Sequence, residues 1–321
     1  MVTESDRDLI RVGVSSCLLG RKVRFDAGHK HDRYLTDELG RWLELVPVCP
    51  EAEVGMGIPR ESVHLTGDAA APRMVGSRSG EDWTERMNRW SRSRVKELGG
   101  EDLCGFVFKK DSPSCGAWRV KVRNPGGMPE RSGRGLFADA FARAHPLLPL
   151  EEEGRLHDAK LRENFIERVF AYHRATRLFL GKWTRGDAVA FHSREKYLLM
   201  AHSPRHYREL GRLVAAVKDH TPAAFRELYL AGFMAALAVH ATPSRHGNAL
   251  LHIVGYLRGH VADEERRRVT EVIADHRAGL VPLIVPMTLV KHYIGLHDIP
   301  YIRDQSYLNP HPRELMLRNH V

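Results

Sequence analysis

The chain has 321 residues, of which 43% are hydrophobic, and it carries a formal net charge of +9 at pH 7. A chain of this size and hydrophobicity can bury a large core and is expected to form two domains, which excludes a disordered or fibrous protein. The charge is spread evenly, +5 in residues 1–185 and +4 in residues 186–321, so it does not indicate a dedicated nucleic-acid-binding arm, and anionic or nucleotide-like partners stay open.

The first 120 residues alternate short apolar runs with helix-like stretches. We expect strands at 9–15, 44–49 and 103–109, and helices at 35–43 and 81–98. Strands that alternate with helical crossovers are typical of a parallel sheet. The N-terminal domain is therefore expected to be α/β, with a Rossmann-like parallel sheet.

The rest of the chain is expected to be helical. Residues 136–182 include the charged amphipathic stretch EEEGRLHDAKLRENFIERVFAYHRATRLFL, and we place the domain boundary within 165–190. The later helices open with Ser, Thr-Pro or an acidic first turn and are expected at 193–218, 221–240, 242–260 and 263–279. The predicted organisation is an α/β domain at 1–170 followed by an all-α helical domain at 186–321, packed as a bundle.

Three of the four cysteines, Cys17, Cys49 and Cys115, lie at or just beyond the carboxyl ends of predicted strands. The carboxyl ends of parallel strands share the edge at which α/β sheets bind ligands, so we expect these three thiols to converge. Cys104 begins its strand, whose length of about 20 Å, at ~3.3 Å per residue, would separate it from that edge. Cys104 is therefore interpreted as a buried core residue.

Several kinds of chemistry use converging thiols. A structural zinc site needs four closed ligands, usually as close Cys-x-x-Cys pairs, and the spacings here differ from that pattern. Three thiolates suit an iron–sulfur cluster, whose usual complement is four cysteines, and the missing ligand would leave one iron open to substrate. A papain-like Cys/His pair and three unrelated core cysteines stay open as alternatives.

Three motifs in order, SSCLLGRKVRFDAGHK, VPVCPEAEVGMGIPRE and FKKDSPSCG, resemble the thiouracil desulfidase family over about residues 9–165. Residues 186–321, with FHSREKYLLMAHSP and YLNPHPRELMLRNHV, resemble a helical domain of unknown function that is often fused to it. The resemblance implies a 4Fe-4S cluster held by Cys17, Cys49 and Cys115, and conversion of 2-thiouracil to uracil without net electron transfer. The segment RFDAGHK departs from the family's usual Tyr-Asp-Gly, a change that bears on the substrate pocket more than on the cluster.

Residues near the cysteines are candidates for acid/base catalysis and for binding the substrate. Glu51 is the candidate general acid/base, because a carboxylate beside a buried cluster has its proton affinity raised; the alternative is that it caps the following turn. Ser112 is a candidate for catalysis and Ser114 for substrate binding, although serines in such loops often make local turn bonds. Four side chains could recognise the base or offset the cluster charge: Asp26, His29, Lys30 and Lys109. The alternative is that they are ordinary solvated charges on the surface.

The expected partner is a small thiolated nucleobase, and no membrane partner is expected. Nothing in the N-terminal sequence resembles a signal peptide and no apolar run reaches the ~20 residues of a membrane span, so we expect a cytoplasmic protein. A second hypothesis is an RNA-binding or sensing module for thiolated RNA or nucleotides, with a structural cluster or zinc site. His202 and His206 are spaced i, i+4, but the Ser-Pro between them is expected to interrupt the helix, and the histidines of the second domain are interpreted as surface or groove residues.

Overall fold

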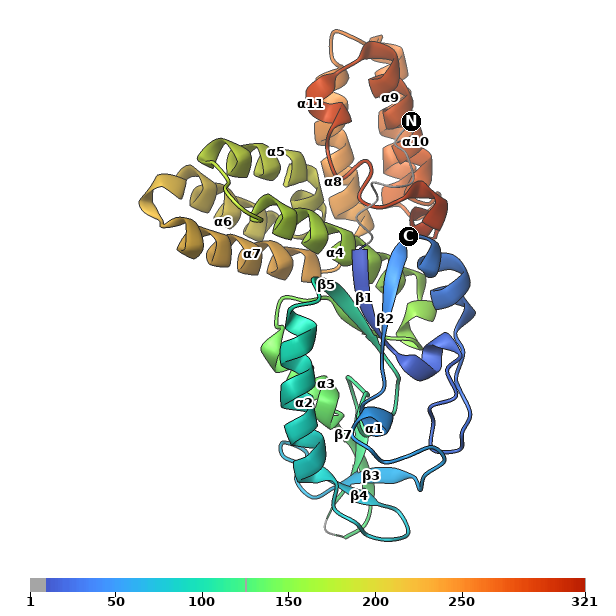
Figure 1. Ribbon diagram of the computed structural model, residues 1–321. Coiled ribbons are helices and arrows are strands. Elements are labelled where there is room, and N and C mark those ends of the chain that lie inside the picture. Colours follow the sequence, from blue (N-terminus) through green and yellow to red (C-terminus); the bar gives the residue numbers. More distant parts are fainter. Residues whose placement is uncertain (1–9, 125, 321) are drawn as a thin grey trace. The chain divides into compact units, whose positions relative to one another are not determined.

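The computed structural model describes residues 10–124 and 126–320, and the chain forms two compact units, Met1–His157 and Asp158–Val321 (Figure 1). The first unit carries two β-sheets and the second is helical, which confirms an α/β domain followed by a helical domain. The division between the units lies before helix α4 (Ala159–Leu178), earlier than the predicted boundary, because α4 packs against helices of the second unit.

The main sheet of the first unit is parallel, as the sequence predicts. Its strands in spatial order are β2 (Leu43–Val48), β1 (Ile10–Ser15), β5 (Leu103–Phe108) and β8 (Leu150–Glu152). Ser15 pairs with Val48, so β1 and β2 end at the same edge. A Cβ atom on Gly13 of β1 would lie 2.2 Å from the Phe106 ring, so glycine is required for this close packing within the sheet.

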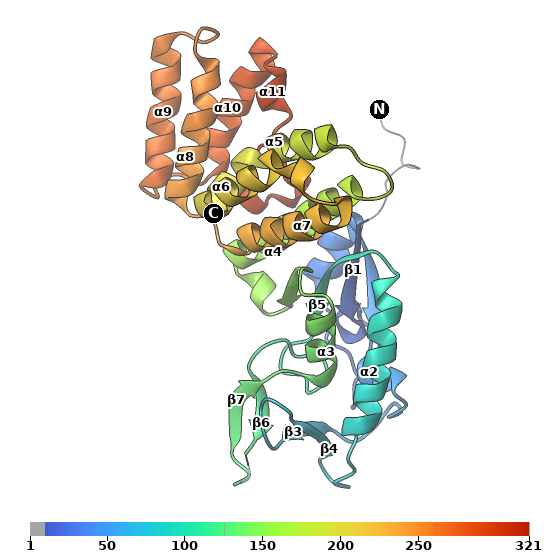
Figure 2. The same cartoon turned by 90° about the vertical axis from the view of Figure 1, so that its left-hand side faces the viewer.

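Helices α2 (Thr84–Gly99) and α3 (Leu136–Ala144) pack against each other on one side of the main sheet (Figures 1 and 2). The contact with the sheet is aromatic: the Phe106 ring of β5 lies 4.9 Å from Phe141 and 5.8 Å from Phe137 of α3, measured between ring centroids. All three side chains are fully buried. This aromatic core fixes β5 and α3 relative to each other, and the loop that directly follows β5, residues 109–119, carries Cys115.

Two predicted helical stretches of the first unit form other structures. Residues 35–43 form only a π-turn, Tyr34–Glu38, and a 3₁₀ turn, Leu39–Arg41, because the segment is too short to repay helix nucleation and contains Gly40. Within the predicted 136–182 helical region, the start forms α3 as expected, but the acidic residues that open the amphipathic stretch at 151 instead contribute to β8. Glu152 is buried there because its Oε1 accepts the backbone N–H groups of Ala117 and Trp118, at 2.8 and 3.2 Å.

A second, mixed sheet was not predicted. Its strands in spatial order are β4 (Arg73–Gly76), β3 (Val63–Thr66), β6 (Val120–Arg123) and β7 (Pro129–Gly133). β3 is antiparallel to β4 and parallel to β6, and β6 is antiparallel to β7. Leu65, Met74 and Val122 of this sheet pack with Trp83 and Met87 in a hydrophobic cluster of their own.

The second unit is built of helices, as predicted. They are α4 (Ala159–Leu178), α5 (Arg185–His202), α6 (Pro204–Ala215), α7 (Pro222–Ala238), α8 (Pro243–Val254), α9 (Asp263–Arg277), α10 (Ile284–His297) and the short α11 (Pro300–Arg303). Thr221 and Thr242 cap α7 and α8 with Pro at the first turn, as expected. The Ser-Pro break is confirmed, since α5 ends at His202 and Ser203 caps α6.

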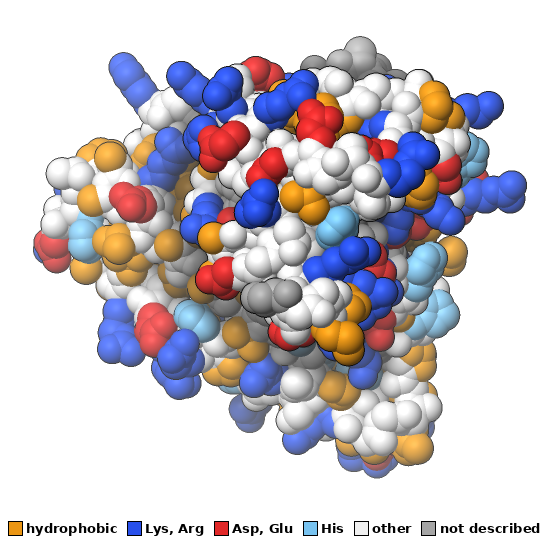
Figure 3. All heavy atoms as spheres, turned by 90° about the horizontal axis from the view of Figure 1, so that it is seen from below, with side chains coloured by type: hydrophobic (Ala, Val, Ile, Leu, Met, Phe, Trp, Pro, Cys, Tyr) orange, Lys and Arg blue, Asp and Glu red, His pale blue; other side chains and the backbone are white. Residues whose placement is uncertain are grey.

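Within the described residues no single helix is long and apolar enough to cross a membrane; α7 and Pro243–Leu257 reach that length and composition only as a pair bent by 118°. Figure 3 shows one face, on which Lys and Arg side chains are interspersed with Asp and Glu. Positive and negative side chains are thus mixed on this face, as they are along the sequence.

Candidate functional site

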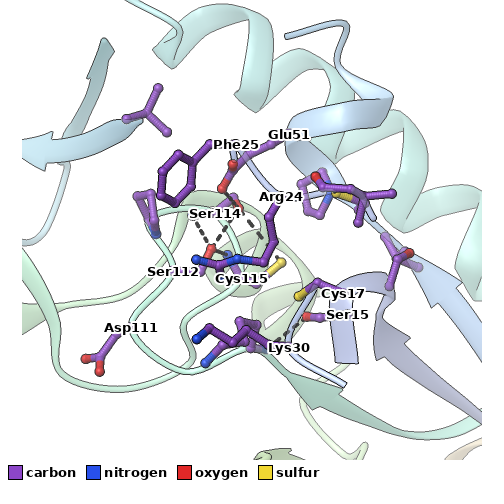
Figure 4. Close-up of a pocket in the computed structure, with 18 of the residues that line it drawn as sticks. Ser15, Cys17, Arg24, Phe25, Lys30, Glu51, Asp111, Ser112, Ser114 and Cys115 are labelled. Carbon is purple, nitrogen blue, oxygen red and sulfur yellow. Dashed lines mark hydrogen bonds between the residues drawn. The ribbon is translucent and has the colours of Figure 1, made fainter. Parts of the chain in front are cut away.

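Three thiols line one pocket of about 390 Å³ in the first unit (Figure 4). Cys17 lies in the 3₁₀ turn Ser16–Leu19 that follows β1, and Cys49 directly follows β2. Cys115 lies in the loop after β5, and Figure 4 shows its side chain next to that of Cys17. The structure therefore brings together the three cysteines that the sequence places at strand ends.

Cys104 lies away from this pocket. It is the second residue of β5, it is 3% exposed, and its Sγ contacts the carbonyl oxygen of Asp102 at 3.7 Å. Burial raises the pKa of the Cys104 thiol to about 12. Its position agrees with a core residue that fills space at the opposite end of the strand.

Burial also dominates the electrostatics of the three pocket thiols. It raises the pKa of Cys17 to about 11, raises that of Cys49, and raises that of the fully buried Cys115 well above its ordinary value. Lys109 and Arg24 oppose this effect on the pKa of Cys17. Lys109 lines the pocket as predicted, but its ammonium is also paired with Glu153 and donates to the Lys110 carbonyl at 3.0 Å.

Glu51 is held on both carboxylate oxygens. It lies in the short helix α1 (Pro50–Glu53), lines the pocket, and has a side chain that is 14% exposed. Its Oε1 accepts the hydroxyl of Ser114 at 2.7 Å and its Oε2 accepts Nη2 of Arg60 at 2.6 Å. The capping role that was the alternative for Glu51 belongs to Glu53, whose Oε1 accepts the Cys49 N–H at 2.7 Å.

Arg60 is a residue of the site that the sequence reasoning missed. Its Nε and Nη2 both donate to Glu51 Oε2, while Nη1 donates to the carbonyls of Val23 and Gly57 at 3.1 and 3.0 Å. Its side chain is 5% exposed. Arg60 lies inside the second motif, VPVCPEAEVGMGIPRE, yet no spacing rule distinguishes it there; only the folded loop places it against Glu51.

The two serines of the SPSCG loop have different contacts. Ser112 Oγ accepts the backbone N–H groups of Ser114 and Cys115, at 3.3 and 3.1 Å, so it fixes the turn that presents Cys115. Ser114 Oγ lies 3.0 Å from Ser112 Oγ and donates to Glu51, which gives a continuous chain from Ser112 through Ser114 to the carboxylate (Figure 4). The serine that touches Glu51 is therefore Ser114.

The start of α3 holds the SPSCG loop through backbone hydrogen bonds. The N–H groups of Leu136 and Phe137 donate to the carbonyls of Pro113 and Ser114, both at 3.1 Å, and Gly135 donates to Gly116 at 2.8 Å. A Cβ atom on Gly135 would lie 2.5 Å from the backbone carbonyl of Ser114. Only glycine allows α3 to begin this close to the cysteine loop.

Two predicted binding residues do not reach the pocket. Asp26 is exposed and its Oδ1 accepts the Gly28 N–H at 3.0 Å, while His29 Nδ1 accepts the His31 N–H at 3.2 Å. Neither lines the pocket, because both are used in local turns of the segment after Cys17. Their neighbours from that segment line it instead: Arg24, Phe25 and Lys30, all labelled in Figure 4.

The donor set of the pocket can be compared with two kinds of metal site. Within the described parts of the chain, no three His, Cys, Asp or Glu side chains are placed to hold a single metal ion. Three thiols from separate segments around a ligand-sized pocket fit a polynuclear centre, because each cysteine binds a different iron of an iron–sulfur cluster. Cationic side chains at the same pocket suit the negative charge of such a centre.

Comparisons with known proteins agree with this division into two domains. Residues 12–153 match the family described as 2-thiouracil desulfurase, and residues 196–312 match a family described as a protein of unknown function, DUF1722. The uncharacterized protein YbgA of Escherichia coli K12 is 34% identical over 158 residues, which are 49% of this chain and 94% of YbgA. A solved structure, described as the [4Fe-4S]-dependent thiouracil desulfidase TudS, is 28% identical and covers 46% of this chain and 93% of its own, with a TM-score of 0.39.

Fold and site together define a two-domain protein, in which an α/β unit carries a thiol-lined pocket and a helical unit follows it. The α/β unit carries the domain described as 2-thiouracil desulfurase, the helical unit carries DUF1722, and the chain belongs to the same family as the uncharacterized protein YbgA. Desulfurisation is the chemistry for which the family matched by the α/β unit is named.

Proposed function

We propose that this protein is an enzyme that converts 2-thiouracil-like bases to the corresponding uracils, without net electron transfer, using a 4Fe-4S cluster held by Cys17, Cys49 and Cys115. The observation that carries the proposal is that these three thiols share one pocket with the Glu51 carboxylate. The family match over residues 12–153 supports the same reaction class.

The pocket offers both a sulfur acceptor and a shaped space for a base. When bound, the cluster would supply an iron without a protein ligand, which can act as a Lewis acid towards the thiocarbonyl sulfur. The volume of about 390 Å³ lies in the range of small-molecule sites. The partly exposed Phe25 ring lines the pocket and offers an aromatic face to a planar base.

Glu51 is placed to move a proton from the attacking water. In the overall reaction the water oxygen bonds to the thiocarbonyl carbon, the C–S bond breaks, and its electron pair leaves on sulfur. Glu51 Oε1 can accept the water proton while Arg60 holds Oε2 in place. The second water proton leaves with the departing sulfur, and Ser114, which bridges Glu51 and Ser112, can turn its hydroxyl to hydrogen-bond the new oxygen without giving up its proton.

Anaerobic metal analysis tests the cofactor. Protein made without oxygen should be brown and carry about four irons and four sulfides per chain, as a 4Fe-4S cluster requires. Cys17→Ala should lose this iron, whereas Cys104→Ala, the matched control outside the pocket, should retain it. Colourless anaerobic protein with one zinc per chain would contradict the proposal.

Glu51→Gln tests the catalytic role separately from assembly. Glutamine keeps the shape and most hydrogen bonds but cannot take a proton, so iron content should stay normal while turnover of 2-thiouracil falls by roughly 10²–10⁴-fold. Unchanged turnover would show that Ser114 or a bound water, and not Glu51, accepts the proton. Loss of iron would show instead that Glu51 is structural.

A further inference from the structure

The proposed reaction leaves one cation of the thiol-lined pocket, Arg24, without a bonding partner. Its side chain lines the pocket, is 22% exposed, and extends into the pocket in Figure 4. Burial raises the pKa of the Cys17 thiol, and the charge of Arg24 acts to lower it, so the guanidinium lies within electrostatic reach of that sulfur atom. A guanidinium has five N–H donors and no acceptor, so a partner for Arg24 must supply acceptor atoms.

The N–H groups of Arg24 are not hydrogen-bonded within the described chain. Its Nε is buried and has no hydrogen-bond partner. Asp26 Oδ1 lies 3.5 Å from Nε as a loose ion pair, and this oxygen accepts the Gly28 N–H at 3.0 Å instead. The Phe25 ring, whose centroid is 5.3 Å from Arg24 Cζ, is the other neighbour of the guanidinium. Both Nη groups of Arg24 are therefore available to a ligand.

The other charged side chains that line the pocket either have partners in the described chain or are exposed to water. Those with partners are Glu51 with Arg60, Lys109 with Glu153, and Asp111 with Arg131, and those that are exposed are Lys30 and Lys110. Among these described side chains, Arg24 is the mostly buried cation that lacks a hydrogen-bond partner.

The backbone on both sides of Arg24 is fixed by Arg60. The Val23 carbonyl accepts Nη1 of Arg60 at 3.1 Å, and the Phe25 carbonyl accepts the Arg60 N–H at 2.9 Å. The Arg24 N–H itself donates to the Gly28 carbonyl at 3.2 Å. Since Arg60 also holds the Glu51 carboxylate, Arg24 and the proposed general base are anchored to the same residue.

We propose that Arg24 binds the oxygen that the substrate keeps, and that it thereby selects thiolated pyrimidines that carry a second, unthiolated oxygen. This assignment rests on the proposed desulfurisation. In 2-thiouracil the sulfur is the atom that the cluster would take, and both ring nitrogens carry hydrogen. The oxygen on C4 is therefore the strong acceptor left for a side chain that can only donate, and its two lone pairs can accept two N–H groups.

A matched pair of ligands tests this role by calorimetry on anaerobic, cluster-loaded protein. 5,6-Dihydro-2-thiouracil and tetrahydropyrimidine-2-thione share a six-membered ring, the sulfur and both N–H groups, and differ in the oxygen on C4. A hydrogen bond to a charged group contributes roughly 10–100-fold to an affinity, so the wild-type protein should prefer the ligand with the oxygen by about this factor.

Arg24→Met keeps most of the side-chain stem and removes every donor. It should lower the ratio of the two affinities at least tenfold and leave the affinity for tetrahydropyrimidine-2-thione nearly unchanged. Arg21→Met is the matched control, because Arg21 is an exposed residue of the same segment outside the pocket, and it should keep the wild-type ratio. An unchanged ratio in Arg24→Met would overturn the proposal, and so would an equal loss of affinity for both ligands, which would place Arg24 against the sulfur or the cluster.

Iron content and turnover of 2-thiouracil, measured on the same samples, separate this proposal from the proposed function. A wild-type protein without iron or without turnover contradicts the function itself, whereas normal turnover with an unchanged affinity ratio contradicts the role of Arg24 alone. If Arg24→Met loses iron, Arg24→Lys replaces it in the comparison, since lysine keeps the positive charge near Cys17 but lacks the planar pair of N–H groups. The affinity ratio should then fall about tenfold, and a wild-type ratio in Arg24→Lys would overturn the proposal.

Discussion

Arg60 is the side chain that fixes the orientation of Glu51. It makes two hydrogen bonds to one carboxylate oxygen and two to backbone carbonyls, which leaves Glu51 Oε1 directed to Ser114. A planar guanidinium can make these four bonds at once, whereas a lysine ammonium has three donors on a flexible stem. Arg60 is therefore a positioning residue for the proposed reaction.

Arg60→Lys should keep the cluster but lower kcat for 2-thiouracil about tenfold, the equivalent of one weakened charge-assisted hydrogen bond, with KM little changed. Steady-state kinetics and iron analysis on the same anaerobic samples separate the two effects. Arg73→Lys is the matched control, because Arg73 makes an exposed pair with Asp82 at 2.7 Å, away from the pocket. A rise in KM at constant kcat would show that Arg60 binds substrate instead.

The loop after β5 and the start of α3 together position Cys115. The carbonyls of Pro113, Ser114 and Gly116 accept the N–H groups at the start of α3, and Gly135 lets the two segments approach. Phe106 packing against Phe137 and Phe141 keeps the strand and helix in register. The SPSCG loop is thus held at its backbone, independently of any ligand.

Gly135→Ala should displace this loop, because its Cβ would lie 2.5 Å from the Ser114 carbonyl. We expect a loss of about 1–3 kcal/mol in the free energy of unfolding, as for other overpacked sites, and fewer irons per chain in anaerobic protein. Gly295→Ala on α10 is the control, since a Cβ there meets no atom within 4 Å. Full iron occupancy in Gly135→Ala would show that the loop adapts without moving Cys115.

Strands with long apolar runs were predictable, and elements that depend on tertiary pairing were not. β1, β2 and β5 are each six residues of mainly apolar sequence, and their order alone brings the cysteines to one edge. The sequence PERSG of β7 has no strand pattern and pairs only because β6 lies beside it. Glu152 enters a strand because two backbone N–H groups satisfy its carboxylate, which no local pattern reveals.

Packing of α5 against α7 makes the helical unit sensitive to acid. His192 of α5 lies with Nδ1 3.1 Å from the Tyr229 hydroxyl of α7, and its ring stacks on Tyr207 of α6. Burial lowers the pKa of His192 to about 4, although nearby Glu195 acts to raise it. The folded unit thus holds a neutral imidazole where the unfolded chain would bind a proton.

Because of His192, the helical unit should lose stability when the pH is lowered. Between pH 4 and the ordinary histidine pKa of about 6.5 the unfolded chain binds more protons, so the free energy of unfolding rises with pH; lowering the pH from about 7.5 to 5 should cost about 2 kcal/mol. His192→Gln keeps a polar partner for Tyr229 but does not titrate. Urea unfolding at both pH values should show a smaller pH dependence in this variant, and an equal dependence would mean that other groups account for it.

At the scale of the whole chain, the sequence predicted two domains with a boundary within residues 165–190, whereas the structure divides before α4. Helix α4 is amphipathic and charged like a connecting segment, and only its contacts assign it to the second unit: Asn164 donates to the Leu237 carbonyl of α7, and Glu167 pairs with His202 of α5. Those contacts join residues far apart in sequence. The division before α4 therefore follows from buried polar pairs that composition does not reveal.

The two units should respond differently to removal of the proposed cluster. Every residue that lines the thiol pocket belongs to Met1–His157, and the helical unit has a separate core that includes Phe225 and Phe233. A ligand stabilises only the part whose folded state binds it, so the cluster should raise the unfolding temperature of the α/β unit alone. Hydrogen exchange with mass spectrometry, on anaerobic protein before and after iron chelation, resolves the two units. Protection should fall in β1, β2 and the SPSCG loop and stay constant in α7 and α8, with Cys17→Ala matching the chelated protein throughout. Equal loss of protection in α7 and α8 would show that the two units unfold as one.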